Sequence, residues 1–163
     1  MEKFTGKVWV LGDDIDTDII IPTEYLALKT IDDMKQYGFS PLRPELAGQI
    51  QKGDIIVAGK NFGCGSSREQ APEVIKALGI PCIIAKSFAR IFYRNALNNG
   101  LLLLEQPELH DVVKEGDTIT VTVNEDVDYN GKKYPIASLP ENLMEIIEAG
   151  GLVKAMRRRN GLD

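Results

Sequence analysis

Short apolar runs alternate with longer amphipathic stretches through the first two thirds of the chain. Four runs have the length and composition of buried strands, at residues 7–11, 54–58, 81–85 and 101–104. Two helical patterns separate the last three runs. The first ends at Gly79, and the second begins after Ser87 as its cap, covers residues 88–98 and ends before Gly100. This order predicts consecutive βαβ units on a parallel sheet, with right-handed crossovers.

The last third of the chain follows a different pattern. Residues 118–123 alternate between polar and apolar side chains, and Asn130-Gly131 is a hairpin-turn signal just before a further strand at 133–136. Helical patterns return near the end, at residues 140–148 and 152–158. We therefore predict an α/β fold with a central parallel or mixed sheet, flanking helices and antiparallel additions, all in a single domain over residues 1–163.

A long irregular excursion precedes the βαβ units. Residues 23–44 show no clean period, and we expect a surface segment that holds a short helix at 30–37. Connections of this length in a compact domain are usually functional or mobile. We expect this one to be mobile and able to close over a ligand.

The segment before the excursion, residues 12–22, is rich in carboxylates. Asp13, Asp14 and Asp16 suit loop and helix-cap positions, and binding of a cation by these three residues is the alternative interpretation.

Composition and charge exclude several classes of partner. The 163 residues are 44% hydrophobic and 26% charged, which is typical of a globular protein. The net charge of −5 argues against a polyanion as the main partner, so we expect no nucleic acid, and we interpret Arg157-Arg158-Arg159 as a solvated helix end. No apolar run approaches the roughly 20 residues of a membrane helix, and no secretory signal pattern begins the chain. We therefore expect a cytoplasmic protein that does not bind membranes.

Few residues of the chain are suited to metal binding. The sequence has two cysteines, Cys64 and Cys82, and one histidine, His110, which we expect at the surface. A cysteine-bound iron–sulfur cluster takes roughly three or four cysteines from one chain. We therefore expect no metal or cofactor on this chain alone, and any metal chemistry would come from a partner. Both cysteines are interpreted as small apolar fillers, although Cys64 is open to a second interpretation as a reactive thiol.

The segment most suggestive of chemistry is NFGCGSSRE at residues 61–69. Its two glycines allow a tight turn, and it lies between a predicted strand and a predicted helix. Ser66 and Ser67 would then stand at the helix N-terminus, where free N–H groups favour an anion, and Arg68 adds a fork suited to a carboxylate. Ser67 and Gln70 also fit a capping box.

Pro72 conflicts with a helix that starts at Ser67, because its missing N–H would remove the bond back to Arg68. Either the first turn is loosened or the helix starts near Ala71. A glycine-rich turn with a serine cap is, moreover, often purely structural.

Ser66 is a poor base by itself. A serine hydroxyl titrates well above ~10, so its use near neutral pH requires offsetting more than ~3 pH units, or over ~4 kcal/mol. A helix N-terminus supplies ~0.3–1 kcal/mol, and no histidine lies nearby in the sequence. The serine becomes a plausible base if a partner brings a Lewis acid that polarises the substrate.

Together these blocks resemble the small subunits of 3-isopropylmalate dehydratase, in the aconitase superfamily, over nearly the whole chain. The resemblance is carried by residues 14–22, 61–69, 85–98 and 148–152. It implies a swivelling β/β/α domain that works with a separate large subunit carrying a [4Fe–4S] cluster. The implied reaction is the isomerisation of 2-isopropylmalate and 3-isopropylmalate by dehydration and rehydration, in leucine biosynthesis.

The resemblance also implies roles for particular residues. Ser66 would be the base that removes or returns the carbon-bound proton of the substrate. Ser67 and Arg68 would bind a substrate carboxylate, and Asp18 matches an active-site aspartate of the superfamily.

The segment after Asp18 bears on the choice of substrate. Homoaconitase-like small subunits carry an arginine after a Tyr-Leu pair, whereas this chain has Ala27 and then Leu28. An apolar lining suits an alkyl group and would leave an extra carboxylate unpaired. A 2,3-dimethylmalate dehydratase or another alkylmalate hydro-lyase shares these needs, and a homoaconitase-type substrate is disfavoured because Ala27 replaces the arginine.

Two alternatives lie outside this enzyme class, namely a stand-alone carboxylate-binding module and, more weakly, an RNA-binding role. Arg90 and Arg94 lie four residues apart on one predicted helix face. We interpret them as forming salt bridges at the surface or between domains, and direct substrate contact is the alternative.

Overall fold

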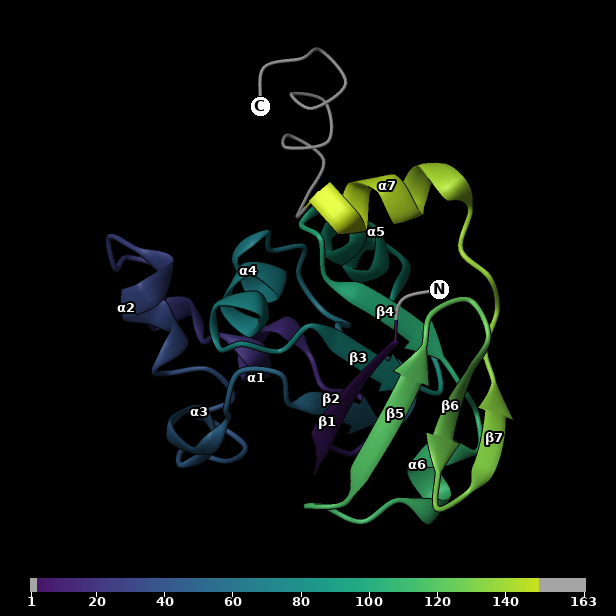
Figure 1. The fold of residues 1–163 in the computed structure, drawn as a ribbon. Coiled ribbons are helices and arrows are strands. Elements are labelled where there is room, and N and C mark those ends of the chain that lie inside the picture. The colour runs from purple at the N-terminus through teal and green to yellow at the C-terminus, as the bar shows by residue number, and fades with distance from the viewer. Residues whose placement is uncertain (1–2, 150–163) are drawn as a thin grey trace.

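The computed structural model describes residues 3–149, which form one seven-stranded mixed sheet with helices on both faces. The strand order is β4-β3-β2-β1-β5-β6-β7 (Figure 1). The strands are β1 (Lys3–Val10), β2 (Ile55–Ala58), β3 (Cys82–Ala85), β4 (Leu102–Glu105), β5 (Thr118–Thr122), β6 (Asp126–Tyr129) and β7 (Lys132–Pro135). The helices are α1 (Thr17–Ile20), η1 (Thr23–Tyr25), α2 (Ile31–Lys35), α3 (Leu46–Gln49), α4 (Gln70–Ala77), α5 (Arg90–Asn98), α6 (Leu109–Val112) and α7 (Glu141–Ala149).

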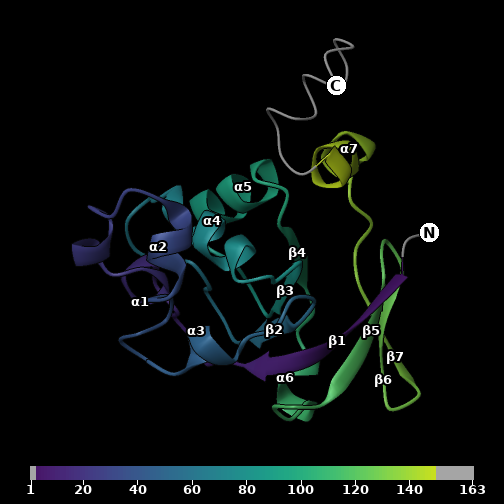
Figure 2. The ribbon, with the colours of Figure 1, turned by 60° about the vertical axis from the view of Figure 1, so that its left-hand side comes forward.

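Strands β1 to β4 form the parallel block that the apolar runs predict. Val8, Ile55, Cys82 and Leu102 stand side by side in register across it. All four residues of β2 and of β3 are fully buried, because α4 and α5 cover one face of the sheet and α6 the other (Figure 2). Covering on both faces explains why these strands are continuous apolar runs rather than alternating ones.

Strands β5 to β7 form an antiparallel arm joined to the block through β1. Strand β1 pairs in parallel with β2 and in antiparallel with β5. The Asn130-Gly131 turn is confirmed, and both of its residues have positive φ, at 52° and 83°. It joins β7 to β6, a short strand with two aspartates that the sequence pattern does not predict.

The start of α4 corrects the sequence prediction. The helix begins at Gln70 and not at Ser67, so Ser66 and Ser67 lie in the preceding loop and the Ser67–Gln70 capping box is wrong. Pro72 is the physical reason, because a start at Gln70 places it in the first turn, where no backbone N–H is needed. Of the two alternatives that Pro72 left open, the later start is confirmed.

Other local predictions also fail. Ser87 does not cap α5, because the N-cap of this helix is Ala89. The Ser87 hydroxyl instead accepts a hydrogen bond from the Asn61 N–H at 2.8 Å. His110 is half-buried, with Nε2 2.7 Å from the Leu11 carbonyl oxygen, rather than fully at the surface. The helix expected at 152–158 and the arginine cluster at 157–159 lie outside the described residues.

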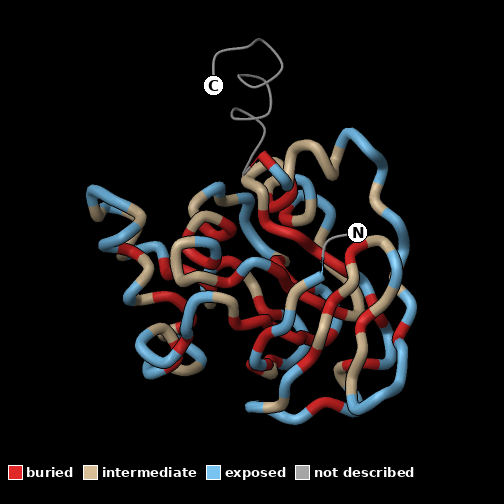
Figure 3. The backbone as a smooth tube through the Cα atoms, in the orientation of Figure 1, coloured by how far each residue is buried: buried red, intermediate tan, exposed pale blue. Residues whose placement is uncertain are grey.

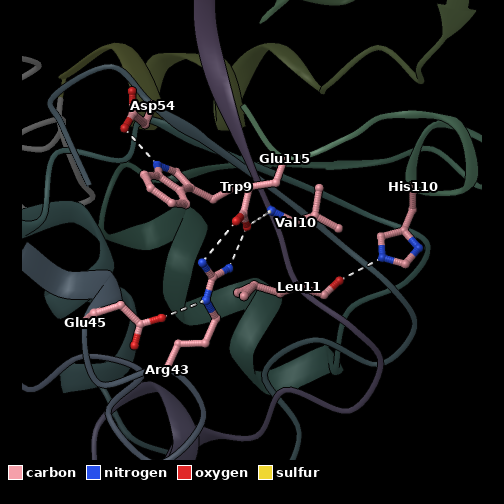
Figure 4. A network of polar contacts seen from close by, with 8 residues as sticks. All are labelled: Trp9, Val10, Leu11, Arg43, Glu45, Asp54, His110 and Glu115. Atoms are coloured by element: carbon pink, nitrogen blue, oxygen red, sulfur yellow. Dashed lines mark hydrogen bonds and ion pairs between the residues drawn. The ribbon is translucent and has the colours of Figure 1, made fainter. Parts of the chain in front are cut away.

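The excursion at residues 23–44 contains η1 and α2 and leads into α3. Tyr25 and Tyr37 stack with their ring centroids 4.0 Å apart, and Phe39 is fully buried. At its end, Arg43 forms a bidentate ion pair with Glu115, whose Oε1 also accepts a hydrogen bond from the Val10 N–H (Figure 4). The excursion is therefore anchored at both ends, and its mobility stays a prediction.

Many of the buried residues lie in the central part of the molecule, in stretches separated by intermediate and exposed residues (Figure 3). Along each parallel strand, alternate residues enter two separate clusters, one on each side of the sheet. Ile56 packs beneath α4 and α5, whereas Ile55 packs beneath α6. Among the described residues, no helix has the length and apolar character needed to cross a membrane.

Candidate active site

Three loops meet at the carboxyl edge of the parallel block. They follow β1, β2 and β3, and in open α/β sheets this edge is where ligands bind. Backbone hydrogen bonds join the loops, from Gly63 N to the Ile15 carbonyl at 2.7 Å and from Thr17 N to the Cys64 carbonyl at 2.9 Å. The buried Thr17 hydroxyl donates to the Ser66 carbonyl at 2.8 Å. The backbone that carries Ser66 is therefore held by the segment that carries Asp18.

Gly63 is required where it stands. Its φ of +85° lies in the left-handed region, and a Cβ at this position would overlap the ring of Phe92. Phe92 in turn packs edge-on against Phe62, with centroids 5.4 Å apart. The glycine thus lets the loop lie directly against α5, which brings the serines close to the first turn of that helix.

A pocket of about 220 Å³ opens between this loop and α5. Its walls are Thr17, Gly63, Gly65, Ser66, Ser67, Arg68, Ala89, Arg90, Ile91, Phe92 and Asn95. Ser66 and Ser67 are exposed, and neither hydroxyl bonds to any residue that the structure describes. Both are therefore available to a ligand.

Arg68 is held in a fixed orientation by the segment around α1. Nη2 lies 2.6 Å from Asp18 Oδ1 and donates to Thr23 Oγ1 at 2.8 Å, and Nη1 donates to the Ile21 carbonyl at 3.0 Å. The Arg68 side chain is 13% exposed and that of Asp18 is 64% exposed. The guanidinium thus reaches the pocket as a pre-oriented group rather than as a free surface cation.

The structure brings together Ser66, Ser67 and Arg68 in the pocket, and Asp18 forms an ion pair with Arg68 without lining the pocket itself. Ala27 and Leu28 do not line the pocket; Ala27 is exposed, and Leu28 packs against the core. Arg90 does line it, in keeping with the alternative interpretation made from the sequence. Asn95 was missed, although its position four residues after Ile91 places it on the same helix face.

The carboxylates before α1 have loop and cap roles, as expected. Asp13 accepts from Lys60 N, Asp14 accepts from Asn61 Nδ2, and Asp16 caps α1 through Ile19 N. No group of three or more potential metal ligands occurs within residues 3–149.

The two cysteines are free thiols with high pKa values. Burial, with added repulsion from Asp16 and Asp14, raises the pKa of the half-buried Cys64 thiol. Burial alone raises the pKa of Cys82 far above its ordinary value. A thiol that resists ionisation is a poor nucleophile and metal ligand, which favours the filler interpretation for both.

A larger hollow of about 550 Å³ lies at the opposite, amino edge of the parallel block. Apolar side chains such as Leu102 and Met144 dominate its walls, with Lys52 and Glu148 at its rim. It contains none of the serines and arginines discussed above. The smaller pocket is therefore the candidate site, because it combines exposed hydroxyls with an oriented cation.

A family model described as the aconitase C-terminal domain matches residues 19–109, more than half of the chain. Fold and site thus define an aconitase-type swivelling domain.

Individual relatives narrow this class. The 3-isopropylmalate dehydratase small subunit of Lachnospira eligens is 79% identical over 162 residues, covering 99% of both proteins. The small subunit 1 of Archaeoglobus fulgidus is 51% identical over 160 residues, covering 94% of this chain and 99% of that protein. The crystal structure of 3-isopropylmalate dehydratase from Methanocaldococcus jannaschii superposes with a TM-score of 0.92 at 38% identity, over 99% of this chain and 97% of that one. This chain belongs to the family of 3-isopropylmalate dehydratase small subunits, and the predicted resemblance and fold class are confirmed.

Proposed function

We propose that this chain is the small subunit of a two-chain hydro-lyase that interconverts 2-isopropylmalate and 3-isopropylmalate in leucine biosynthesis. Membership of the family supports this proposal, as does a pocket that combines two exposed serine hydroxyls with an oriented arginine. We also propose that the enzyme works in the cytoplasm, where thiols such as Cys64 and Cys82 stay reduced.

Within the pocket, we assign Arg68 and Ser67 to a substrate carboxylate. Arg68 presents donors in the fork geometry that suits a carboxylate, and its contacts with Asp18, Thr23 and Ile21 hold that fork before the substrate arrives. Ser66 Oγ then takes the carbon-bound proton as water is lost, and returns a proton to carbon when water adds again at the neighbouring position.

The observation that carries the two-chain proposal is the lack of a proton acceptor for Ser66 in the described part of the chain. The lone histidine, His110, has its Nε2 on the Leu11 carbonyl and lies outside the pocket. Ser66 needs over ~4 kcal/mol of stabilisation to act as a base near neutral pH, and His110 is not placed to provide it. We infer that a [4Fe–4S] cluster on the large subunit supplies Lewis-acid binding of the substrate hydroxyl and carboxylate. Two cysteines with high pKa values make this chain itself unsuited to holding the cluster.

We also propose that the excursion that contains Ala27 and Leu28 selects the substrate. Neither residue lines the pocket in this structure, so their contribution requires residues 23–44 to move toward it. An alanine in place of an arginine leaves that side of the substrate site without a cation, which suits an alkyl group. Related alkylmalates, such as 2,3-dimethylmalate, satisfy the same requirement.

The decisive experiment is Ser66→Ala in the reconstituted two-chain enzyme. We expect kcat to fall by ~100-fold or more, the scale of a lost general base, while assembly with the large subunit is unchanged. Ser138→Ala is the matched control, because Ser138 is exposed and lies outside both the pocket and the 23–44 excursion, and it should leave both quantities unchanged. Retention of most activity by Ser66→Ala would show that the base lies elsewhere.

Calorimetry on the isolated chain separates this proposal from a stand-alone binding module. The split enzyme predicts weak or undetectable binding of isopropylmalate without the large subunit, because the substrate contacts that the large subunit would make are missing. Tight binding to the isolated chain would favour the module instead.

A further inference from the structure

The mouth of the pocket carries an unusual surface residue. Ile91, the second residue of α5, is 58% exposed, and of the three large apolar side chains that the described residues expose, it alone lines this pocket. The other two, Leu42 and Val112, are 45% and 43% exposed and lie away from it. An exposed isoleucine by itself is ordinary, so what distinguishes Ile91 is its place at the rim of the candidate site and the neighbours it has there.

Two arginines flank this isoleucine. Arg90 precedes it, and Arg94 follows one turn later on the same side of α5. Both are exposed, and neither forms an ion pair or hydrogen bond with any residue in 3–149. Arg68, by contrast, already has an ion-pair partner in Asp18 at 2.6 Å. Although the whole chain has a net charge of −5, this rim is therefore locally basic and unpaired.

We propose that Arg90, Ile91 and Arg94, the α5 ridge, form a docking surface for the large subunit. The partner surface would be an apolar socket for Ile91 bordered by carboxylates that pair with the two arginines. This inference rests on the proposed function, because it takes the large subunit as the partner.

Geometry and charge both lead to this partner. If a second chain completes the site that contains Ser66, the rim of this pocket must contact that chain. Ile91 and Ser66 line the same pocket, so Ile91 would lie at that contact. Burying two arginines against a neutral surface would leave charges unpaired, so the partner must present carboxylates there. Apolar anchors surrounded by complementary charge are the usual centres of binding energy in interfaces.

The test is the dissociation constant between this chain and the large subunit encoded by the same genome, measured by calorimetry with purified proteins. For Ile91→Asp we expect the dissociation constant to rise by ~30-fold, the effect of losing an interface anchor. For Arg94→Glu we expect a rise of ~10-fold and a weaker dependence on salt concentration. Both variants should fold, because both positions are exposed and an aspartate is favourable in the first turn of a helix. Equal melting temperatures verify this.

Two matched controls make the same changes away from the ridge. Val112→Asp alters an exposed apolar residue on α6, which packs on the opposite face of the sheet. Lys52→Glu reverses an exposed charge at the amino edge. Neither should change the dissociation constant by more than ~2-fold. At saturating large subunit, kcat of Arg94→Glu should stay within ~2-fold of the wild-type value, because Arg94 does not line the pocket and acts in binding rather than in proton transfer.

The outcomes distinguish this inference from the proposed function. If the wild-type chains assemble and are active but Ile91→Asp and Arg94→Glu bind as the wild type does, the α5 ridge is not the docking surface and the proposed function stands. If the wild-type chains neither assemble nor catalyse the reaction, the proposed function fails. If the isolated chain forms dimers that Ile91→Asp abolishes while large-subunit affinity is unchanged, the ridge binds a second copy and the inference is overturned.

Discussion

At the scale of single residues, the site is organised around one guanidinium. Arg68 forms an ion pair with Asp18 and donates hydrogen bonds to Thr23 and the Ile21 carbonyl. All three partners lie in the segment that follows β1. This arrangement fixes the donor fork in advance, so less side-chain freedom is lost when a carboxylate binds. We therefore propose that Asp18 is a positioning residue for Arg68, rather than a group that itself binds an anionic substrate.

This role predicts different effects for two substitutions of Asp18. Asp18→Ala removes the acceptor at 2.6 Å from Arg68, and we expect KM to rise by ~10-fold because the fork is no longer held. Asp18→Asn keeps an oxygen acceptor and should recover part of that loss. Steady-state kinetics of the two-chain enzyme measures both. Asp128→Ala, which removes the ion pair with Lys133 on the antiparallel arm, is the control. An unchanged KM in Asp18→Ala would exclude the positioning role.

The sequence identifies the chemical groups of the site better than their contacts. The motif at 61–69 supplies Ser66, Ser67 and Arg68, which the structure places in one pocket, and the segment at 14–22 supplies Asp18, which pairs with Arg68; their roles stay predictions. The partners of Arg68 could not be predicted, because a backbone carbonyl such as that of Ile21 has no sequence signature and becomes available only when the loops meet. Arg90 was left between two interpretations for the same reason, since a helix face shows spacing but not what stands opposite.

At the scale of elements, the glycine-rich loop and α5 act as one unit. The ring of Phe92 occupies the space that a side chain at residue 63 would need, so the loop and the helix fit only with a glycine there. This contact sets the distance between the serines on one element and Arg90 on the other.

Gly63→Ala should therefore damage both stability and activity. A residue with a Cβ is strained at a φ of +85°, and the methyl group would push against Phe92. We expect a loss of ~2 kcal/mol or more in the free energy of unfolding, measured by urea titration. Gly48→Ala is the contrasting control, because nothing lies within 4 Å of its added Cβ and it stands within α3, where alanine is neutral or slightly stabilising. Equal stability of the two variants would contradict the steric argument.

The ion pair between Arg43 and Glu115 holds the end of the excursion at residues 23–44 against the rest of the molecule. The hydrogen bond from Arg43 is the main cause that lowers the pKa of Glu115 below its ordinary value of 4.5. A lowered pKa in the folded state stabilises the fold above the unfolded value, and this stabilisation is lost as the pH falls through the lowered pKa. The side chains are 25% and 37% exposed, so solvent screens the pair and its contribution is modest.

Glu115→Gln tests this link by removing the charge while keeping an acceptor. We expect the variant to be less stable by ~0.5–1 kcal/mol near neutral pH, because the ion pair is lost. In urea titrations over a range of pH, the difference from the wild type should disappear as the wild-type carboxylate becomes protonated under acidic conditions. A difference that persists unchanged into acid would mean that the charge is not its source.

Helices and strands are predicted correctly where the local sequence pattern is sufficient. They are missed or left ambiguous where contacts with neighbouring segments determine the structure. The apolar runs identify β2, β3 and β4 within a residue or so, because burial on both faces leaves a continuous signature. Strand β6 was missed because Asp126 and Asp128 read as loop residues, and only pairing with β5 and β7 makes them extended. The start of α4 was ambiguous because Pro72 allowed two solutions that the surrounding loop had to resolve.

At the scale of the whole molecule, one sheet separates two buried clusters, and its two parts differ in how far their side chains are buried. The parallel block is covered on both faces, whereas the antiparallel arm buries mainly alternate side chains such as Ile119 and Val121. The candidate site lies at the carboxyl edge of the well-covered block. A rigid block beneath the pocket suits a site whose serines and arginine must be held in place.

The two edge strands test this uneven distribution of stability, because each has four residues and each pairs on one side only. Three residues of β4 are buried, whereas in β7 only Tyr134 is buried. If burial rather than position in the sheet sets local stability, the hydrogen-bonded amides of β4 should exchange with solvent deuterium ~100-fold more slowly than those of β7. Native-state exchange at low urea concentrations, read by mass spectrometry, measures both strands in one sample. Equal rates in β4 and β7 would mean that the sheet opens as one cooperative unit and that the block beneath the pocket has no stability of its own.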